Sequence, residues 1–165
     1  MRVGFTGTRN GMTKPQIEAT KKLLVAHNPT EFHHGDCVGA DAEAHRLARS
    51  IRTNRTIPFI HIEVHPPNKD VYRAFCQGDV IHPVADYVVR DHAIVDATEV
   101  LIACPGTFKQ YRGSGTWLTY RYARDHSDSQ IFIVFPDGTV LDRSKECLPG
   151  EPERVQFSGV NSSHR

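Results

Sequence analysis

Glycines and small polar residues gather at three points of the chain, each next to a short apolar stretch. The three groups are Gly7-Thr8-Arg9, the segment with Gly35, Asp36, Gly39 and Asp41, and Gly113-Ser114-Gly115-Thr116. A helix start presents free N–H groups and a partial positive charge, which suits phosphate. Glycine lets the backbone approach a ligand closely, and Ser or Thr adds hydroxyl donors. Together the three groups indicate an anion or nucleotide site.

Several side chains near these groups have more than one role open to them. Arg9 could pair with phosphate through its planar fork or lie solvated in a loop. Asp41 could stabilise a helix dipole or accept hydrogen bonds from ribose hydroxyls. Arg90 could contact a ligand or pair with a carboxylate. Tyr111 and Trp117 could stack on a base or pack against their neighbours. The sequence leaves these alternatives open.

Other site chemistries fit the sequence less well. The glycine spacing is neither G-x-G-x-x-G nor that of a phosphate-binding P-loop, and no lysine follows a glycine loop as a P-loop requires. Dinucleotide redox chemistry and ATP hydrolysis are therefore disfavoured, and we expect no cofactor. The cysteines form no C-x-x-C pair, and the adjacent His33 and His34 would point to opposite faces of a strand. We therefore expect no metal site.

The elements that would position these residues alternate along the chain. Apolar runs predict strands at 2–7, 30–34, 59–64, 100–104 and 131–135, and helical spacing predicts helices from residue 13 to 28, at 40–51, 87–98 and from about 115 to 125. A short helix is expected at 70–76, and Pro136-Asp137-Gly138 predicts a hairpin into 139–141. The pattern predicts a single-domain, Rossmann-like, doubly wound α/β fold with a mostly parallel sheet and a C-terminal hairpin. In such sheets ligands lie at the carboxyl ends of the strands, where the glycine groups fall.

Length and composition narrow the remaining classes. The 165 residues, 39% apolar and 24% charged, fit one globular domain, expected at 1–143, followed by a polar tail at 144–165 that is disordered or adds an edge strand at 154–157. A formal net charge of +1 makes a nucleic-acid partner unlikely. No apolar run approaches the roughly 18 residues that span a bilayer, and no secretory signal opens the chain, so we expect no membrane contact and a cytoplasmic location with reduced cysteines.

Four segments resemble the SLOG superfamily, a Rossmann-like group that includes the DNA-processing protein A domain and the LOG nucleotide hydrolases. They are Val3-Gly-Phe-Thr-Gly-Thr-Arg9, His34-Gly-Asp-Cys-Val-Gly-Ala-Asp41 with Ala44-His45, Arg90-Asp-His-Ala-Ile94 with Asp96 and Leu101-Ile-Ala-Cys-Pro105, and Gly113-Ser-Gly-Thr116. The resemblance extends over residues 3 to about 136. It implies a nucleotide-derived ligand above the sheet, and relatives imply a homo-oligomer by analogy only.

The resemblance implies three functions. The leading one is a sensor or sequestering module that binds a nucleotide or nucleotide-derived ligand. The first alternative is an N-glycosidase acting on nucleoside 5′-monophosphates, with an acid from Asp36, Asp41 or Asp96. LOG hydrolases carry a glutamate where this chain has Thr119, and the usual asparagine after Arg90 is Asp91; both departures argue against hydrolysis. The second alternative is a single-stranded DNA module, which the net charge disfavours.

Overall fold

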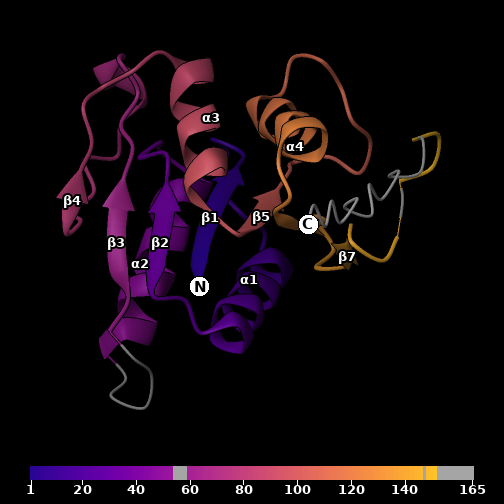
Figure 1. Ribbon diagram of the computed structural model, residues 1–165, viewed down its shortest axis with the longest axis horizontal. Helices are drawn as coiled ribbons and strands as arrows, with labels where there is room; N and C mark the ends of the chain where they lie inside the picture. The colour runs from indigo at the N-terminus through magenta and orange to yellow at the C-terminus, as the bar shows by residue number, and fades with distance from the viewer. Residues whose placement is uncertain (54–58, 147, 152–165) are drawn as a thin grey trace, which may run out of the picture.

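Short apolar runs become the strands of a seven-stranded sheet with helices on both faces (Figure 1). The structure, a computed structural model, describes residues 1–53, 59–146 and 148–151. The strands are β1 (Arg2–Gly7), β2 (Glu31–His34), β3 (His61–Val64), β4 (Val80–Ile81), β5 (Val100–Cys104), β6 (Gln130–Val134) and β7 (Val140–Asp142). The helices are α1 (Lys14–His27), α2 (Ala40–Thr53), α3 (Tyr87–Ala97) and α4 (Gly115–His126), with a 3₁₀ turn, η1, at Asp70–Tyr72.

The strand order is β4-β3-β2-β1-β5-β6-β7. Neighbouring strands are parallel except for β6 and β7, which pair antiparallel as the expected hairpin. From β1 the chain builds outward through β2 to β4, and then crosses back to place β5 on the other side of β1. The order therefore reverses between β1 and β5, and the predicted Rossmann-like, mostly parallel fold is confirmed. In such folds the switch point is where a ligand crevice forms.

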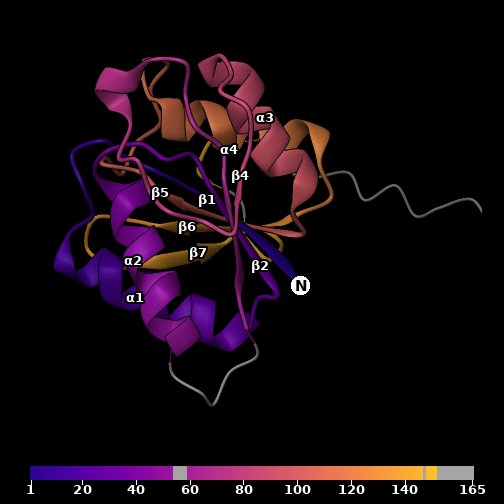
Figure 2. The ribbon, with the colours of Figure 1, turned by 90° about the vertical axis from the view of Figure 1, so that its left-hand side faces the viewer.

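Two apolar layers hold the sheet between the helices. Figure 2 shows α1 and α2 on one side of the sheet and α3 and α4 on the other. Successive residues of a strand point to opposite faces. Ile102 accordingly joins the apolar cluster that contains Leu24 of α1, whereas Leu101 joins the cluster around Trp117 of α4. All residues of β5 are buried, which explains why its sequence is a continuous apolar run.

The start of α1 is fixed locally and then tied to the carboxyl edge of the sheet. The Gln16 N–H donates to Thr13 Oγ1 (3.2 Å) and the Thr13 N–H donates to Gln16 Oε1 (3.0 Å), which forms a capping box. The Gln16 amide also donates to the carbonyls of Pro105 (2.8 Å) and Val134 (2.9 Å). One buried side chain thus anchors α1 to the ends of β5 and β6.

The structure differs from the sequence prediction on the β3–β4 side of the sheet. Strand β3 begins at His61 rather than at residue 59, and the helix expected at 70–76 is only the single turn η1. Strand β4 was not anticipated, because two exposed residues carry no periodicity. It forms because Val80 and Ile81 pair with β3 along its free edge. The edge strand expected at 154–157 lies outside the described residues. No helix in the described ranges has the length and apolar character needed to cross a membrane.

The domain boundary expected after Arg143 falls inside a packed polar network. Arg143 is buried, and its Nε donates to Glu151 Oε2 (3.2 Å). The same oxygen accepts a hydrogen bond from the Tyr120 hydroxyl (2.9 Å), and Arg124 Nη1 donates to Glu151 Oε1 (2.9 Å). Leu148 packs against the apolar cluster around Trp117. The chain as far as Glu151 therefore contributes to the α4 face of the domain.

Replacing Glu151 should reveal this contribution. Glu151→Ala removes a largely buried carboxylate that accepts from two arginines and a tyrosine, so we expect the free energy of unfolding to fall by roughly 1.5–3 kcal/mol. Glu146→Ala is the matched control, because Glu146 is exposed and lies on the same segment. Urea denaturation of the two variants measures the difference. Equal stability in both would mean that Glu151 does not stabilise the domain.

Candidate functional site

A cavity of about 750 Å³ opens at the carboxyl ends of β1 and β5, at the point where the strand order reverses. Its volume lies within the roughly 300–1,000 Å³ range of small-molecule sites. The walls come from the loops after β1, β2, β3 and β5 and from the starts of α3 and α4. They are formed by Thr6, Gly7, Thr8, Arg9, Asn10, Cys37, Val38, Asp41, Lys69, Tyr72, Tyr87, Arg90, Asp91, Gly106, Tyr111, Gly113, Ser114, Gly115 and Thr116.

Most of the site residues expected from the sequence line this cavity. Those brought together are Gly7, Thr8, Arg9, Asp41, Arg90, Gly113, Ser114, Gly115 and Thr116. Gly35, Asp36 and Gly39 are not among the lining residues. All three glycine groups therefore contribute to the cavity, but the second group does so only through Asp41 among its predicted site residues.

The glycines of the second group serve the backbone and a neighbouring arginine. Gly39 has φ +88°, a left-handed conformation, and a Cβ there would collide with the carbonyl of Arg9. A Cβ on Gly35 would overlap the guanidinium of Arg90. Both positions need glycine because other parts of the protein pass close to the backbone. The structure thus gives both residues a packing role, and neither lines the cavity.

Asp36 turns away from the cavity and holds the loop after β3. Its carboxylate accepts from Arg73 Nε (2.9 Å) and from the Cys76 N–H (2.8 Å), and the side chain is buried. Asp36 itself has φ +57°, which an aspartate tolerates better than most residues. The Asp36 carboxylate is thus hydrogen-bonded to the segment that follows η1. The expectation that Asp36 contacts a ligand is not supported by its position.

The start of α4 forms part of the cavity wall. Ser114 caps the helix by accepting from the Trp117 N–H (3.2 Å), and its carbonyl accepts the Leu118 N–H (2.9 Å). The first two helical residues, Gly115 and Thr116, line the cavity and have no intrahelical acceptor. Gly115 does not have positive φ, and the nearest atom to an added Cβ would be a Tyr87 ring carbon at 3.6 Å. Space for a ligand therefore exists at this helix end.

Arg9 is exposed in the loop after β1, where it stacks on a tyrosine and is not paired with a carboxylate of the described residues. Its guanidinium lies over the Tyr72 ring, 4.3 Å from the centroid, and 5.7 Å from the Tyr87 centroid. Within the described ranges no carboxylate lies within 4.0 Å of Arg9 or of Lys69. Stacking on tyrosine orients the planar fork of Arg9 without neutralising its charge. The cavity therefore has two cations whose charge an anion could balance.

Arg90 forms ion pairs with two acidic residues. Its Nη1 lies 3.0 Å from Asp91 Oδ1 and 3.8 Å from Asp41 Oδ2, and all three residues are buried. Its Nη2 donates to Cys37 Sγ (3.4 Å), and the guanidinium lies 4.8 Å from the Tyr87 ring centroid. Of the two roles left open by the sequence, the carboxylate pairing is present. Arg90 also lines the cavity, where its charge is already balanced within the protein.

The two acids beside Arg90 have unusual pKa values. Burial raises the pKa of Asp41 to about 7, although Arg90 and a hydrogen bond from the Cys37 N–H oppose the shift. Burial also raises the pKa of Asp91, against the effects of Arg90 and of the Thr119 hydroxyl, which donates to Asp91 Oδ2 (2.9 Å). A carboxyl that titrates near neutral pH can hold or release a proton under physiological conditions.

Sequence reasoning missed several lining residues, and the structure separates the roles of the two aromatic residues that it had left open. Lys69 and Tyr72 were missed because they reach the cavity from the long segment after β3, which has no glycine group to mark it. Asp91 was noted only as a departure from the family pattern. Trp117 is fully buried and donates from Nε1 to Thr107 Oγ1 (3.0 Å), so its role is packing. Tyr111 is 52% exposed and lines the cavity, so it stays available for stacking.

Histidines form two further polar groups elsewhere on the sheet. His33 and His34 point to opposite faces, as predicted for adjacent strand residues. His33 Nδ1 lies 3.0 Å from His65 Nε2, whereas His34 Nε2 lies 3.0 Å from His45 Nδ1 of α2. Burial lowers the pKa of His65 to about 3 and holds that of His34 well below its usual value. The sequence prediction considered only the adjacent pair and missed both groups.

Comparisons with known proteins show the fold. No protein-family model matches the chain, and a search of curated proteins finds no match. Among solved structures, the chain is similar to the molybdenum cofactor binding protein from the phototrophic bacterium Rippkaea orientalis. The TM-score is 0.60 at 16% sequence identity, over 81% of this chain and 75% of that one. The chain and this protein share a Rossmann-like architecture at a distant level.

The raised pKa of Asp41 predicts a pH dependence of stability. Its pKa rises from 3.8 to about 7 on folding, so between these values the folded protein holds more protons than the unfolded chain. The contribution of Asp41 to the free energy of unfolding therefore falls as pH rises through this window. Asp41→Asn keeps an acceptor for the Cys37 N–H and removes the titration. We expect the stability of Asp41→Asn relative to wild type to be more favourable at pH 8 than at pH 5.

Urea denaturation at both pH values measures this change. Asp128→Asn is the matched control, since Asp128 is exposed in the loop between α4 and β6. A stability difference between Asp41→Asn and wild type that is the same at pH 5 and pH 8 would contradict the prediction.

Proposed function

We propose that this chain binds a nucleotide or nucleotide-derived ligand in the cavity, with a phosphate at the start of α4, as a sensor or sequestering module. The observation that carries the proposal is the open end of α4: Gly115 and Thr116 line the cavity, and their N–H groups have no acceptor within the helix. Such a helix end attracts anions through its N–H donors and its dipole. The SLOG-like motifs supply the same expectation, because the segments that carry the resemblance meet here.

The charges around the cavity favour an anion over a neutral ligand. Arg9 and Lys69 line the cavity without a carboxylate within 4.0 Å in the described part of the chain. Arg90 contributes less, since Asp41 and Asp91 already balance it. A phosphate would give Arg9 the bidentate partner that its planar fork accommodates. The ligand phosphate therefore belongs between Arg9 and the start of α4.

The tyrosines favour a ligand that has a ring as well as a phosphate. Tyr72, Tyr87 and Tyr111 line the cavity, and Tyr111 is half-exposed. A nucleobase can stack on such a ring, and the volume of about 750 Å³ exceeds what a phosphate alone requires. The similar protein from Rippkaea orientalis is a molybdenum cofactor binding protein, which is consistent with small-molecule binding on this fold.

A phosphate series tests the proposal directly. Calorimetric titrations should compare a nucleoside, its 5′-monophosphate, ribose 5-phosphate and inorganic phosphate. We expect a nucleoside 5′-monophosphate to bind more tightly than the nucleoside and more tightly than phosphate alone, because both the helix end and the tyrosines then contribute. Binding that is indifferent to the phosphate would overturn the assignment of the α4 start.

Gly115→Asp should separate binding from folding. The aspartate places a carboxylate where the phosphate would lie, and two charges about 4 Å apart repel by about 4 kcal/mol at an effective dielectric near 20. We therefore expect affinity for a nucleoside monophosphate to fall about a thousandfold. The same acid at a helix start should stabilise the ligand-free protein by roughly 0.3–1 kcal/mol.

Gly115→Asn is the control, because it has the same shape as the aspartate without its charge. Melting temperature and calorimetric affinity should be measured for both variants. Equal loss of affinity in both would point to a steric effect at this position. Retained affinity in Gly115→Asp would remove the start of α4 from the phosphate site.

A second candidate, cleavage of the N-glycosidic bond of a nucleoside 5′-monophosphate, rests on the acids beside Arg90. Asp41 and Asp91 line the cavity, whereas Asp36 is bonded to Arg73 and Asp96 is exposed on α3, bonded to the Tyr122 hydroxyl. The pKa of Asp41, near 7, suits a general acid. The two departures from the LOG pattern also meet here, since the Thr119 hydroxyl donates to Asp91. In this chain the carboxylate beside Thr119 comes from Asp91 of α3, whereas the glutamate of the LOG pattern would stand in α4 at the position of Thr119.

Incubation with nucleoside 5′-monophosphates distinguishes binding from cleavage. Under the leading proposal, chromatography should detect no more free base than in a protein-free control. Base release that is lost in both Asp41→Asn and Asp91→Asn, with nucleotide affinity retained, would establish the glycosidase instead. A homo-oligomer, a cytoplasmic location and the lack of a nucleic-acid partner stay predictions from the sequence.

A further inference from the structure

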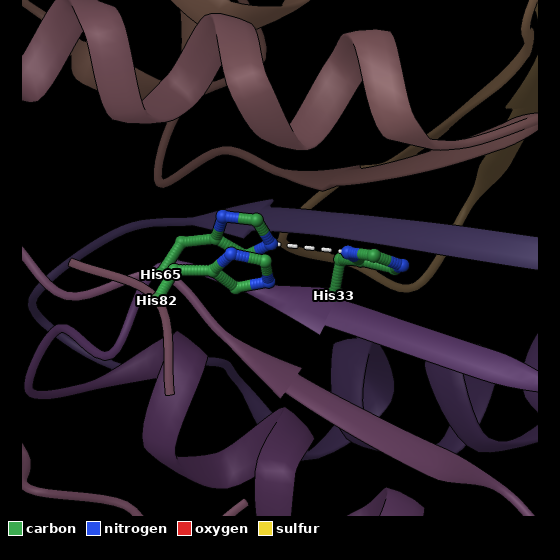
Figure 3. A group of neighbouring side chains, drawn as sticks. All are labelled: His33, His65 and His82. Carbon is green, nitrogen blue, oxygen red and sulfur yellow. Dashed lines mark hydrogen bonds between the residues drawn. The ribbon is translucent and has the colours of Figure 1, made fainter. Parts of the chain in front are cut away.

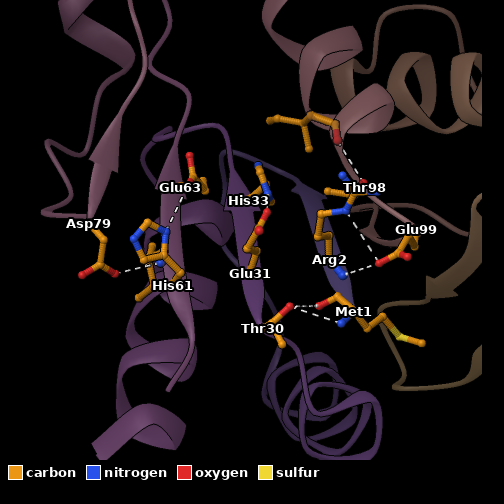
Figure 4. Close-up of polar contacts among 12 residues, drawn as sticks. Met1, Arg2, Thr30, Glu31, His33, His61, Glu63, Asp79, Thr98 and Glu99 are labelled. Carbon is orange, nitrogen blue, oxygen red and sulfur yellow. Dashed lines mark hydrogen bonds and ion pairs between the residues drawn. The ribbon is translucent and has the colours of Figure 1, made fainter. Parts of the chain in front are cut away.

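Acidic and histidine side chains form a row across one face of β2 and β3. In β2, Glu31 and His33 are two residues apart, and in β3 and just beyond it His61, Glu63 and His65 repeat the same spacing. Residues two apart on a strand point to the same face. His33 is in register with Glu63 on the neighbouring strand, so both sets share that face. Figure 4 shows this row from His61 and Glu63 to His33 and Glu31.

Three imidazoles converge at the carboxyl end of the row. His33 comes from β2, His65 follows β3, and His82 follows β4; one ring nitrogen from each lies within 4.8 Å of the other two. His33 Nδ1 is 3.0 Å from His65 Nε2. The rings of His65 and His82 are stacked, with centroids 4.0 Å apart (Figure 3). Residues distant in sequence are thus gathered by the strand order β2-β3-β4.

We propose that His33, His65 and His82 bind a divalent transition-metal ion, with Zn²⁺ as the ion that best fits three imidazoles. Two nitrogens on one tetrahedral Zn²⁺, at about 2.0–2.1 Å each, lie roughly 3.3–3.4 Å apart, close to the His33–His65 separation of 3.0 Å. Glu31 and Glu63 flank the imidazoles and supply negative charge for a dication. Three protein ligands leave the fourth position for water.

The hydrogen bonds of His33 prepare it for this role. Its Nε2 lies 3.1 Å from Glu31 Oε2, and a carboxylate only accepts, so Nε2 carries the proton. In the neutral ring the lone pair is then on Nδ1, the nitrogen that faces His65. Metal-binding histidines commonly donate their other N–H to a carboxylate in this way.

The second histidine group provides a contrast within the same protein. His34, His45 and Cys76 also place one candidate atom each within 4.8 Å. However, His34 Nδ1 accepts the Asp36 N–H (3.2 Å), so the proton of the neutral ring is on Nε2, the nitrogen that faces His45. His34 cannot move this proton to Nδ1, whereas His65 Nδ1 makes no hydrogen bond within the described residues and can take the proton that a metal ion displaces from Nε2. The His34 group therefore forms a buried hydrogen-bond network, and the His33 group is the one suited to a metal ion.

Metal titration of the tag-free full chain, stripped with chelator, tests the proposal. We expect one equivalent of Co²⁺ to give the visible bands of nitrogen and oxygen coordination at micromolar protein concentration, and Zn²⁺ to displace it. A thiolate-to-Co²⁺ charge-transfer band in the near ultraviolet would instead assign the metal to cysteine and overturn the proposal. Failure to bind either ion stoichiometrically would overturn it as well.

Two histidines bonded to the same glutamate provide a matched pair of variants. His82 and His61 contact the two oxygens of Glu63, and their side chains are 37% and 43% exposed. His82→Gln should weaken Zn²⁺ binding at least about tenfold, since losing even an outer partner of a ligand costs roughly 10–100-fold. His61→Gln should stay within about twofold of wild type, because His61 is outside the three. Equal losses would show nonspecific binding to a histidine-rich surface.

A measurement on the unaltered protein makes the test independent of variant folding. Long-range ¹H–¹⁵N spectra of the histidine rings distinguish a metal-bound Nδ1 from a metal-bound Nε2. We expect Zn²⁺ to bind Nδ1 of His33 and Nε2 of His65, and to leave both rings of the His34–His45 pair unchanged. Shifts confined to exposed histidines such as His61 would refute the site.

Discussion

Burying the Arg90 guanidinium requires negative charge beside it, and meeting that requirement joins separate segments of the chain. Asp91 comes from the same helix, Asp41 from the start of α2, and both are buried with it. Gly35 must lack a side chain because the guanidinium occupies that space. Leaving a buried charge without its partner costs about 3–5 kcal/mol. The end of β2 and the starts of α2 and α3 are therefore held around one ionic cluster.

This cluster also decides how the cavity can recognise a ligand. Because two acids balance Arg90, the positive character of the cavity comes from Arg9, Lys69 and the end of α4. Arg9 is held by stacking on Tyr72, which orients its charge without neutralising it. Burial in turn raises the pKa values of both acids, and the nearby Arg90 only partly opposes this effect. The cavity is therefore lined both by the cations Arg9 and Lys69 and by Asp41, a carboxyl that can be protonated near neutral pH.

Strand alternation gives the β2–β3 half of the sheet two different faces. Phe32 and Ile62 point into the apolar cluster beneath α1 and α2, whereas their neighbours His33 and Glu63 point to the opposite face. The apolar side stabilises the strands, so the other side is free to gather polar groups. The proposed metal site depends on this division. It would not exist if β4 did not place His82 beside His65 at the edge of the sheet.

The sequence by itself determined the alternation of strands and helices, the parallel sheet and the edge at which the cavity lies. These follow from local signals: continuous apolar runs for buried strands, helical spacing for α1 to α4, and glycines at the strand ends. Parallel strands place all those ends on one edge, so Gly7, Asp41 and Gly115 could be assigned to one cavity before the fold was known.

Only the tertiary structure decided which side chains face the cavity. Asp36 and Asp41 are five residues apart in equally polar surroundings, yet one is bonded to Arg73 and the other to Arg90. Lys69 and Tyr72 reach the site, and Trp117 does not, because of packing between segments distant in sequence. The convergence of His33, His65 and His82 depends on the pairing of three strands, one only two residues long. Local patterns set each element, but side-chain partners across long loops are set by the three-dimensional packing alone.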